Sequence, residues 1–321
     1  MLTMARLDPF VSRVLEAETP AGKPDTLKLL LPLTTEPGVP FDATLVALRD
    51  NSVPTLECDW TTTISCPAAG VEPIKFKFTP GQLAAARMQN IVIEQPGIHR
   101  FELACEGANV VSTPTVCRAD HPFRVFWGDP HVHTILSNCH PEKCRSLPFA
   151  YFAGRYLSAL DWMACADHVS NGRCALPQWR EETAASNHHN DPGNFVALPA
   201  YEASLKGMHG GDNNIYMRRW PAYFVDHFAE GTVKTLLDEL LADHLPPDDA
   251  FAVPHHTTRT GKHGEIPAEI YPGEKRMPVV EITSCWGNSE IRGNPDALKA
   301  VHEGPSYVVD LLNQGLPLGF V

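Results

Sequence analysis

The sequence contains no apolar run long enough to cross a membrane, and its first eight residues lack the apolar core of a signal peptide. Basic residues are also scarce, because 26 lysines and arginines stand against 38 aspartates and glutamates, giving a formal charge of −12. Proteins that bind nucleic acid or anionic membranes display basic residues to neutralise phosphates. No repeat or low-complexity tract is present. We therefore expect a folded, cytoplasmic protein that binds neither nucleic acid nor membrane.

The composition allows two domains, since the chain has 321 residues and 43% of them are hydrophobic. Before residue 122 the apolar segments are short and are separated by proline or glycine, which is typical of an antiparallel β-sandwich. The expected strands cover residues 26–31, 42–48, 56–64, 74–78, 91–94, 98–105 and 109–116. Residues 80–88, which include three successive alanines, are expected to be helical. We predict an immunoglobulin-like sandwich over residues 1–121.

After residue 121 apolar strands alternate with segments that have helical spacing, which is typical of parallel β/α units. The expected helices cover residues 148–158, 228–244 and 294–312. We predict a β/α barrel over residues 122–321.

Ligand-type residues close several of the apolar runs in this second half. His131 and His133 follow Val125-Phe126-Trp127, and side chains two apart on a strand share a face. Later runs end in Asp167-His168, Glu202, His255-His256 and Glu281. The carboxyl ends of parallel strands meet at one face of a β/α barrel, so these residues are expected to converge on one metal site.

The order of these motifs resembles the PHP (polymerase and histidinol phosphatase) superfamily. The opening motif is similar to Asp129-Pro130-His131-Val132-His133-Thr134, and later ones are similar to Ala166-Asp167-His168, Leu198-Pro199-Ala200-Tyr201-Glu202 and Val253-Pro254-His255. The nearest resemblance is to a branch with an N-terminal β-sandwich. It implies a distorted TIM-like barrel, two or three divalent ions (zinc, manganese or iron) and phosphoesterase activity. The family's last motif, an aspartate and a histidine two apart, has no counterpart before Val321, so the barrel is expected to be incomplete at its C-terminus.

The candidate site residues fall into two groups by expected role. The expected metal ligands are His131, His133, His168, Glu202, His255 and Asp212, and the expected catalytic or orienting residues are Asp167, Glu281 and Arg259. His255 and His256 alternate along a strand, so one of them is expected to enter the site, with His255 preferred. Cys139 is a minor ligand candidate. Arg259, Lys262 and His263 follow His255 in a loop and could hold an anionic group.

The main hypothesis for the activity is a metal-dependent hydrolase that acts on a small anionic ester. A phosphoester is preferred, and a sulfate ester is an alternative, because a metal-activated water can attack either tetrahedral anion. A second alternative is a protein that binds a metal or a partner without catalysis. The sequence is compatible with a monomer or an oligomer. The nine cysteines leave at least one thiol free, and without an export signal we expect reduced thiols rather than Cys58–Cys66 or Cys105–Cys117 disulfides.

Overall fold

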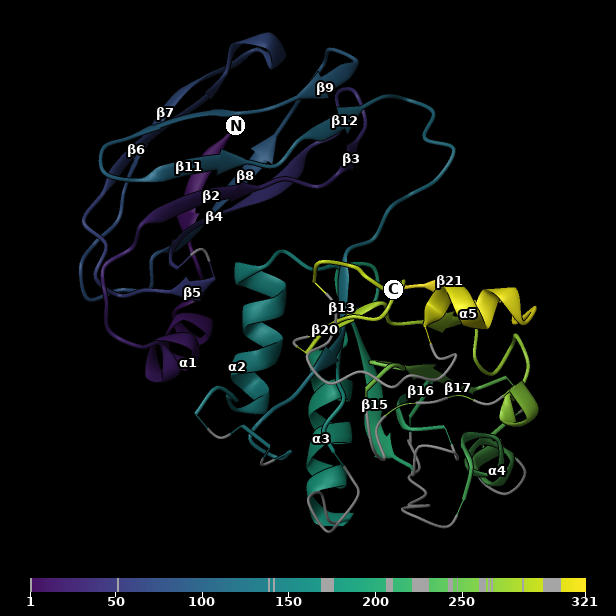
Figure 1. The fold of residues 1–321 in the computed structure, drawn as a ribbon. Coiled ribbons are helices and arrows are strands. Elements are labelled where there is room, and N and C mark those ends of the chain that lie inside the picture. The colour runs from purple at the N-terminus through teal and green to yellow at the C-terminus, as the bar shows by residue number, and fades with distance from the viewer. Residues whose placement is uncertain are drawn as a thin grey trace. The chain divides into compact units, whose positions relative to one another are not determined.

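The computed structural model describes most of the chain (Figure 1). The described residues are 2–50, 52–137, 139–140, 142–168, 176–205, 210–220, 231–241, 245–246, 248–259, 264, 266, 268–284, 286–296 and 307–321. They form two compact units: Met1–Asp129 with Pro148–Trp162, and Pro130–Leu147 with Met163–Val321. No helix in the described ranges is long and apolar enough to cross a membrane.

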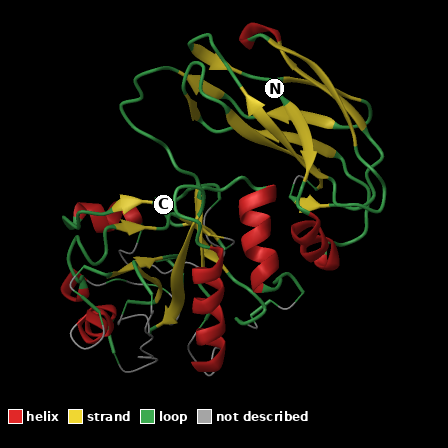
Figure 2. Cartoon of the chain, turned by 180° about the vertical axis from the view of Figure 1, so that it is seen from behind, coloured by secondary structure: helices red, strands yellow, loops and turns green. Residues whose placement is uncertain are grey.

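The first unit is rich in strands, as Figure 2 shows for the part of the chain that carries the N-terminus. Its elements are β1 (Thr3–Arg6), α1 (Pro9–Glu18), β2 (Thr26–Leu30), β3 (Thr34–Thr35), β4 (Phe41–Arg49), β5 (Val53–Pro54), β6 (Thr61–Cys66), η1 (Pro67–Ala69), β7 (Val71–Lys77), β8 (Ala85–Ile91), β9 (Gly97–His99), β10 (Glu102–Cys105), β11 (Asn109–Ser112) and β12 (Thr115–Cys117), followed after the crossing by α2 (Leu147–Phe152) and the π-helix η2 (Ala153–Leu157).

Three sheets make up this unit. The largest has the strand order β1-β8-β4-β2-β11, with β5 attached to β4, and the other two have the orders β10-β6-β7 and β3-β12-β9. Buried side chains of β2, β4 and β8 pack against buried side chains of β6 and the start of β7, for example Leu45 and Met88 against Ile64. This shared core lies between two layers of strands, because side chains alternate between the two faces of each strand.

The other face of the large sheet is covered by helices. Asp8 caps α1 by accepting hydrogen bonds from the amides of Phe10 and Val11. Leu15 of α1 packs with Val46 of β4 and with Leu157 of η2. The first unit therefore includes residues beyond the expected boundary at 121, because the apolar face of 148–157 is buried in the core of this unit.

The prediction of a helix at residues 80–88 is wrong, because Ala85–Ile91 form strand β8. This strand is hydrogen-bonded to β1 on one side and to β4 on the other. Ala86 and Met88 are fully buried in the core between the sheets. The helix preference of alanine is worth less than about 1 kcal/mol per residue, and pairing with two strands outweighs it here.

The second unit contains one main sheet and short helices. Its elements are β13 (Gly128–Val132), β14 (Trp162–Cys165), α3 (Leu176–His189), β15 (Val196–Ser204), β16 (Asp212–Met217), α4 (Val233–Glu239), β17 (Ala250–Pro254), η6 (Ala268–Ile270), β18 (Val279–Val280), β19 (Thr283–Ser284), β20 (Gly287–Asn288), α5 (Val308–Asn313) and β21 (Gly319–Phe320). The main sheet has the strand order β13-β14-β15-β16-β17. The amide of Glu281 donates to the carbonyl of Pro254, which places β18 beside β17, and β21 runs parallel to β18.

The prediction of a TIM-like β/α barrel is wrong. Strand β16 pairs antiparallel with both β15 and β17, whereas a β/α barrel contains parallel strands only. Within the described residues no strand pairing joins β13 to β21, so the sheet is open there. Strand β16 could not be expected from the sequence, because Asp212, Asn213 and Asn214 are poor strand formers. All three are nevertheless buried in the structure.

The expected helices of the second half are present only in part. Residues 148–158 contain α2 and η2. Residues 233–239 form α4 within the expected range 228–244, of which 228–230 and 242–244 lie outside the described residues. Residues 308–313 form α5 at the end of the expected range 294–312, of which 297–306 lie outside the described residues. Buried residues of α3, α4 and α5, including Trp179, Leu236 and Leu311, share one core with the main sheet.

Candidate metal centre

The first three strands of the main sheet bring four ligand-type residues to one edge. His131 lies in β13, and His133 follows the end of this strand. His168 follows β14 and forms a parallel bridge with Glu202 of β15, so β14 and β15 run in the same direction. The carboxyl ends of neighbouring parallel strands lie at the same edge of a sheet, and this geometry gathers the four side chains.

The antiparallel strand contributes to the same edge through its start. Asp212 begins β16 and lies opposite Ser204 at the end of β15. His255 and His256 follow β17, which runs in the same direction as β15 because both pair antiparallel with β16. Glu281 follows β18. One reversed strand therefore leaves the convergence intact, because it presents its amino end where its neighbours present their carboxyl ends.

Glu202 is the centre of the cluster. Its Oε2 lies 2.8 Å from Nε2 of His133 and 2.9 Å from Nδ1 of His168. Nε2 of His131 lies 3.6 Å from the same oxygen and 3.0 Å from Nε2 of His133. The other carboxylate oxygen, Oε1, lies 3.1 Å from Nε2 of His255. Four imidazoles from three segments of the chain thus face one carboxylate that is 1% exposed.

Oε2 of Glu202 also has the environment of a cation ligand. Despite these short distances it accepts no well-directed hydrogen bond from any residue in the described part of the chain. Burial alone would raise the pKa of this carboxyl, but the charge of His255 and the nearby imidazoles hold it well below its ordinary range. A buried carboxylate that stays ionised, with imidazole nitrogens converging on the same oxygen, fits a divalent metal ion.

The two histidines of the first motif are each held at their other ring nitrogen. Nδ1 of His131 lies 3.0 Å from Oε2 of Glu281, and Nδ1 of His133 lies 3.2 Å from Sγ of Cys139. Burial would lower both pKa values. The nearby carboxylates of Glu202 and Glu281 instead raise the pKa of His131 to about 10, and the contact with Cys139 and the carboxylate of Glu202 raise the pKa of His133 to about 9. Both rings therefore direct Nε2 toward Glu202, as metal-binding histidines do when an acceptor fixes Nδ1–H.

Both His255 and His256 lie in the cluster, whereas strand alternation predicted that only one would. Nε2 of His256 lies 3.0 Å from Oδ2 of Asp212, and the two histidine rings are 4.1 Å apart. His256 has a φ of 36°, so the chain has left the extended conformation on which the alternation rule depends. Burial and the charge of His255 lower the pKa of His256 to about 4, so the ring is neutral and able to bind a metal at neutral pH.

Several overlapping groups of these side chains could hold a metal ion. In each group the ligand atoms lie within 4.8 Å of one another. The groups are His131-His133-Glu202, His131-His255-Glu281, Asp212-His255-His256 and His133-Cys139-His168. All six expected metal ligands belong to at least one group, as do Glu281, Cys139 and His256.

Asp167 organises the loop between His133 and Cys139. Its buried carboxylate accepts hydrogen bonds from the amide and hydroxyl groups of both Thr134 and Ser137. The Ser137 hydroxyl in turn accepts from the amide of His168. Asp167 therefore contacts the backbone segments that carry the histidines, whereas its position beside His168 predicted that it would orient an imidazole directly.

Arg259 is positioned by an aromatic ring. Its guanidinium carbon lies 4.0 Å from the centre of the Trp286 ring, a cation–π geometry. Its expected role in holding an anionic substrate stays a prediction, and Lys262 and His263 lie outside the described residues.

Glu182 lies on α3 in a polar stretch, and no motif singles it out in the sequence. It is 1% exposed, and burial together with the charge of Asp167 raises its pKa well above the ordinary range. The pKa of Glu182 is therefore shifted in the direction opposite to that of Glu202, toward the protonated form.

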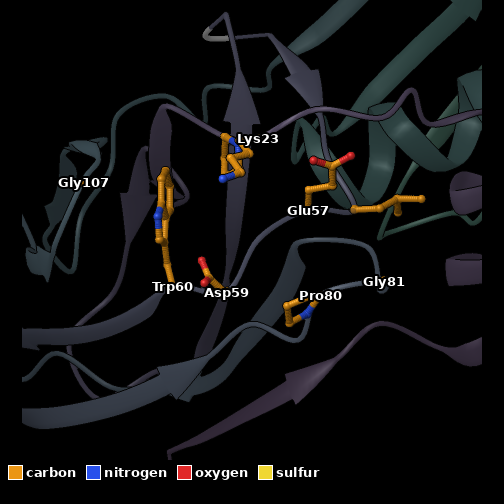
Figure 3. A pocket seen from close by; sticks show the side chains of 9 residues that line it. Lys23, Glu57, Asp59, Trp60, Pro80, Gly81 and Gly107 are labelled. Carbon is orange, nitrogen blue, oxygen red and sulfur yellow. The ribbon is translucent and has the colours of Figure 1, made fainter.

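The first unit has a separate cavity of about 580 Å³. Its lining includes the indole of Trp60, the ammonium of Lys23 and the carboxylates of Glu57 and Asp59 (Figure 3). This mixture of one cationic and two anionic groups contains no histidine or cysteine, so the cavity has a different chemistry from the cluster around Glu202.

No family model matches the chain, and no curated protein matches it. Among solved structures, a similarity is found to the CARDB domain of the PF1109 protein from Pyrococcus furiosus, determined in complex with di-metal ions. The identity is 12%, the TM-score is 0.21, and the match covers 30% of this chain and 96% of that domain. At this TM-score the similarity does not establish a shared fold.

Proposed function

We propose that this protein is a metal-dependent hydrolase of small anionic esters, with phosphoesters as the preferred substrate class. The observation that carries the proposal is the convergence of three imidazole nitrogens on Oε2 of Glu202, which is buried, ionised and without a directed hydrogen bond in the described residues. A structural ion pair would leave this oxygen hydrogen-bonded, since buried charges are stabilised that way.

His131, His133, His168, Glu202 and His255 would hold the metal. A bound divalent ion lowers the pKa of a water molecule and polarises an ester oxygen. Glu281 accepts from Nδ1 of His131 and keeps that ring in the orientation in which Nε2 faces Glu202. Asp212 and His256 add a carboxylate and a neutral imidazole beside His255, and this supports a second ion.

The donor set bears on the identity of the metal. Imidazole and carboxylate ligands suit zinc, manganese and iron, and the nearby thiol of Cys139 adds a preference for zinc. The overlapping ligand groups support two or three ions per site as part of the same proposal. The resemblance of the motif order to PHP phosphoesterases supports phosphate as the substrate group, independently of the barrel that the structure contradicts.

The charge of the chain also favours a metal-dependent reaction on an anion. With a formal charge of −12, the protein repels an anionic substrate unless a local positive centre attracts it. A divalent ion at Glu202 supplies such a centre.

The proposal is tested by metal content and turnover of two matched double variants. His131→Ala/His133→Ala removes two of the proposed ligands, and His188→Ala/His189→Ala removes two adjacent histidines at the end of α3 that belong to none of the ligand groups. After incubation with zinc or manganese and gel filtration, we expect metal and hydrolysis of model phosphomonoesters or diesters in the wild type and the control only. Equal, negligible metal in all three proteins refutes the site.

The same measurement separates hydrolysis from metal binding without catalysis. Stoichiometric metal in the wild type with no turnover of phosphate or sulfate esters would refute the hydrolase and leave a binding protein. Turnover of sulfate esters alone would keep the hydrolase and change the substrate class.

A further inference from the structure

The cavity of the first unit lies where four connections of the chain meet. Lys23 belongs to the connection from α1 to β2, and several of the residues 56–60 belong to the connection from β5 to β6. Pro80 lies between β7 and β8, and Gly107 lies between β10 and β11. Loops held by a rigid sandwich often carry binding residues. A volume of about 580 Å³ is also typical of sites for small molecules.

The connection from β5 to β6 is anchored to the rest of the sandwich. The carbonyls of Leu56 and Trp60 accept hydrogen bonds from the amides of Gly81 and Phe78, at 2.8 and 3.0 Å. Cys58 is fully buried in the core between the sheets, whereas the acidic residues on either side of it are exposed. This wall of the cavity is therefore fixed by the fold of the first unit.

The indole of Trp60 forms an aromatic wall. It is half-buried and packs against the core between the sheets. Gly107 has a φ of 81°, and a methyl group on its Cα would lie 3.8 Å from Nε1 of the indole, so the turn between β10 and β11 borders the ring. Figure 3 shows Lys23, Asp59 and Glu57 together on the other side of the indole. Among aromatic rings, that of tryptophan attracts cations most strongly.

The three charged side chains of the cavity do not neutralise one another. In the described part of the chain, Lys23 forms no ion pair with Glu57 or Asp59. Oε1 of Glu57 accepts a hydrogen bond from the amide of Gly22 at 3.2 Å, which joins two of the connections. A neutral ligand would displace water from these charged groups without supplying an opposite charge, which costs free energy. A ligand with one positive and one negative end compensates both signs.

We propose that this cavity binds a small zwitterion of the betaine or amino-acid class. The alkylammonium end lies against the indole of Trp60, beside the carboxylates of Glu57 and Asp59, where cation–π attraction and charge act together. The carboxylate end lies at the ammonium of Lys23, the one cationic group among the described lining residues. The inference concerns the first unit and is independent of the proposed metal centre.

The affinity should be modest, because the charged side chains of the cavity are exposed and water screens them. We expect dissociation constants on the order of 1 to 10 mM, as for a ligand that forms one cation–π contact and a few screened charge pairs. Increasing the salt concentration should weaken binding further.

The experiment titrates the full chain with glycine betaine and with γ-butyrobetaine, which differ in the separation of their two charges. Calorimetry gives the affinity, and the indole N–H signal of Trp60 in NMR spectra locates the ligand; the signal is assigned by its absence from Trp60→Leu. Two matched compounds each lack one charge. Tert-butylacetate has the shape of glycine betaine without the cation and should bind at least about tenfold more weakly. Tetramethylammonium lacks the carboxylate and should bind about two- to fivefold more weakly.

The variants separate the two ends of the ligand. Lys23→Gln should weaken the betaines about two- to fivefold and leave tetramethylammonium unaffected. Lys75→Gln is the matched control, because it removes an exposed lysine of β7 that does not line the cavity, and it should change neither affinity. Trp60→Leu keeps an apolar side chain and should weaken all cationic ligands about 3- to 30-fold, with circular dichroism as the check on folding.

Three results overturn the proposal. The first is the absence of heat and of any shift of the Trp60 signal with both betaines at about 100 mM, well above the expected dissociation constants. The second is equal affinity for glycine betaine and tert-butylacetate, which would make the cavity a purely apolar site. The third is binding of methyl glucoside more tightly than either betaine, which would make it a carbohydrate site.

Discussion

The charge of Glu202 should control metal affinity, and Glu202→Gln tests this with little change of shape. The side chain is 1% exposed and both of its oxygens face imidazole nitrogens at 2.8–3.6 Å. Two unit charges about 4 Å apart in a medium of effective dielectric constant of about 20 interact by about 4 kcal/mol. This energy corresponds to a factor of about 10³ in affinity, and a divalent ion bound closer to the carboxylate would lose at least that much.

Glu182→Gln is the matched control, because Glu182 is also 1% exposed but belongs to none of the four ligand groups, and burial and the charge of Asp167 raise its pKa. Zinc affinity is measured by chelator competition, and circular dichroism confirms that both variants are folded. We expect a loss of about 10³ for Glu202→Gln and less than about threefold for Glu182→Gln. A folded Glu202→Gln protein that binds zinc within tenfold of the wild type, or an equal loss in both variants, would refute the assignment of Glu202 as the central ligand.

Two further predictions concern the stability of the metal-free protein and the loop between His133 and Cys139 that Asp167 organises. The folded-state pKa values of His131 and His133, about 10 and 9, lie above the ordinary 6.5, so their contribution to stability is complete below pH 6.5 and is lost as the pH rises through 9–10. His256, with a pKa of about 4, destabilises the folded state as the pH falls below 6.5. The urea concentration at the unfolding midpoint should therefore be highest near pH 6.5 and fall on both sides. A midpoint that is constant from pH 7 to 10 would contradict the contribution of His131 and His133. The two carboxylate oxygens of Asp167 accept four hydrogen bonds, and Asp167→Asn leaves only one acceptor oxygen. The substitution should lower the unfolding free energy by about 3 kcal/mol in urea titrations and weaken zinc binding. Unchanged stability would show that water replaces these bonds.

Much of the ligand cluster could be predicted because several of the ligands end apolar runs. A strand that is largely buried and polar at its end marks a sheet edge in the sequence itself, and His168, Glu202 and His255 follow this pattern. His131 differs, because the apolar run Val125-Phe126-Trp127 is exposed and precedes β13. Spatial proximity then follows from the rule that neighbouring parallel strands end together, without knowledge of the whole fold.

The relative directions of the strands in the main sheet could not be predicted in the same way. Strand β16 begins with Asp212-Asn213-Asn214, residues that favour turns, and becomes a strand only because β15 and β17 supply hydrogen bonds on both sides. The same tertiary effect turns the alanines of β8 into a central strand. In both cases the pairing partners are distant in sequence and local preference gives no account of them.

A reversed strand explains why the expected ligands lie together although the predicted barrel is wrong. The predicted barrel and the observed sheet agree on the direction of β15 relative to β17, because two antiparallel pairings through β16 restore the original direction. The insertion separates Glu202 and His255 by one further strand, yet Nε2 of His255 still lies 3.1 Å from Oε1 of Glu202, since the imidazole reaches across the amino end of β16. Asp212 occupies that amino end and contacts His256. The reversed strand therefore adds a carboxylate to the cluster, and an all-parallel sheet would have placed the start of that strand at the opposite edge.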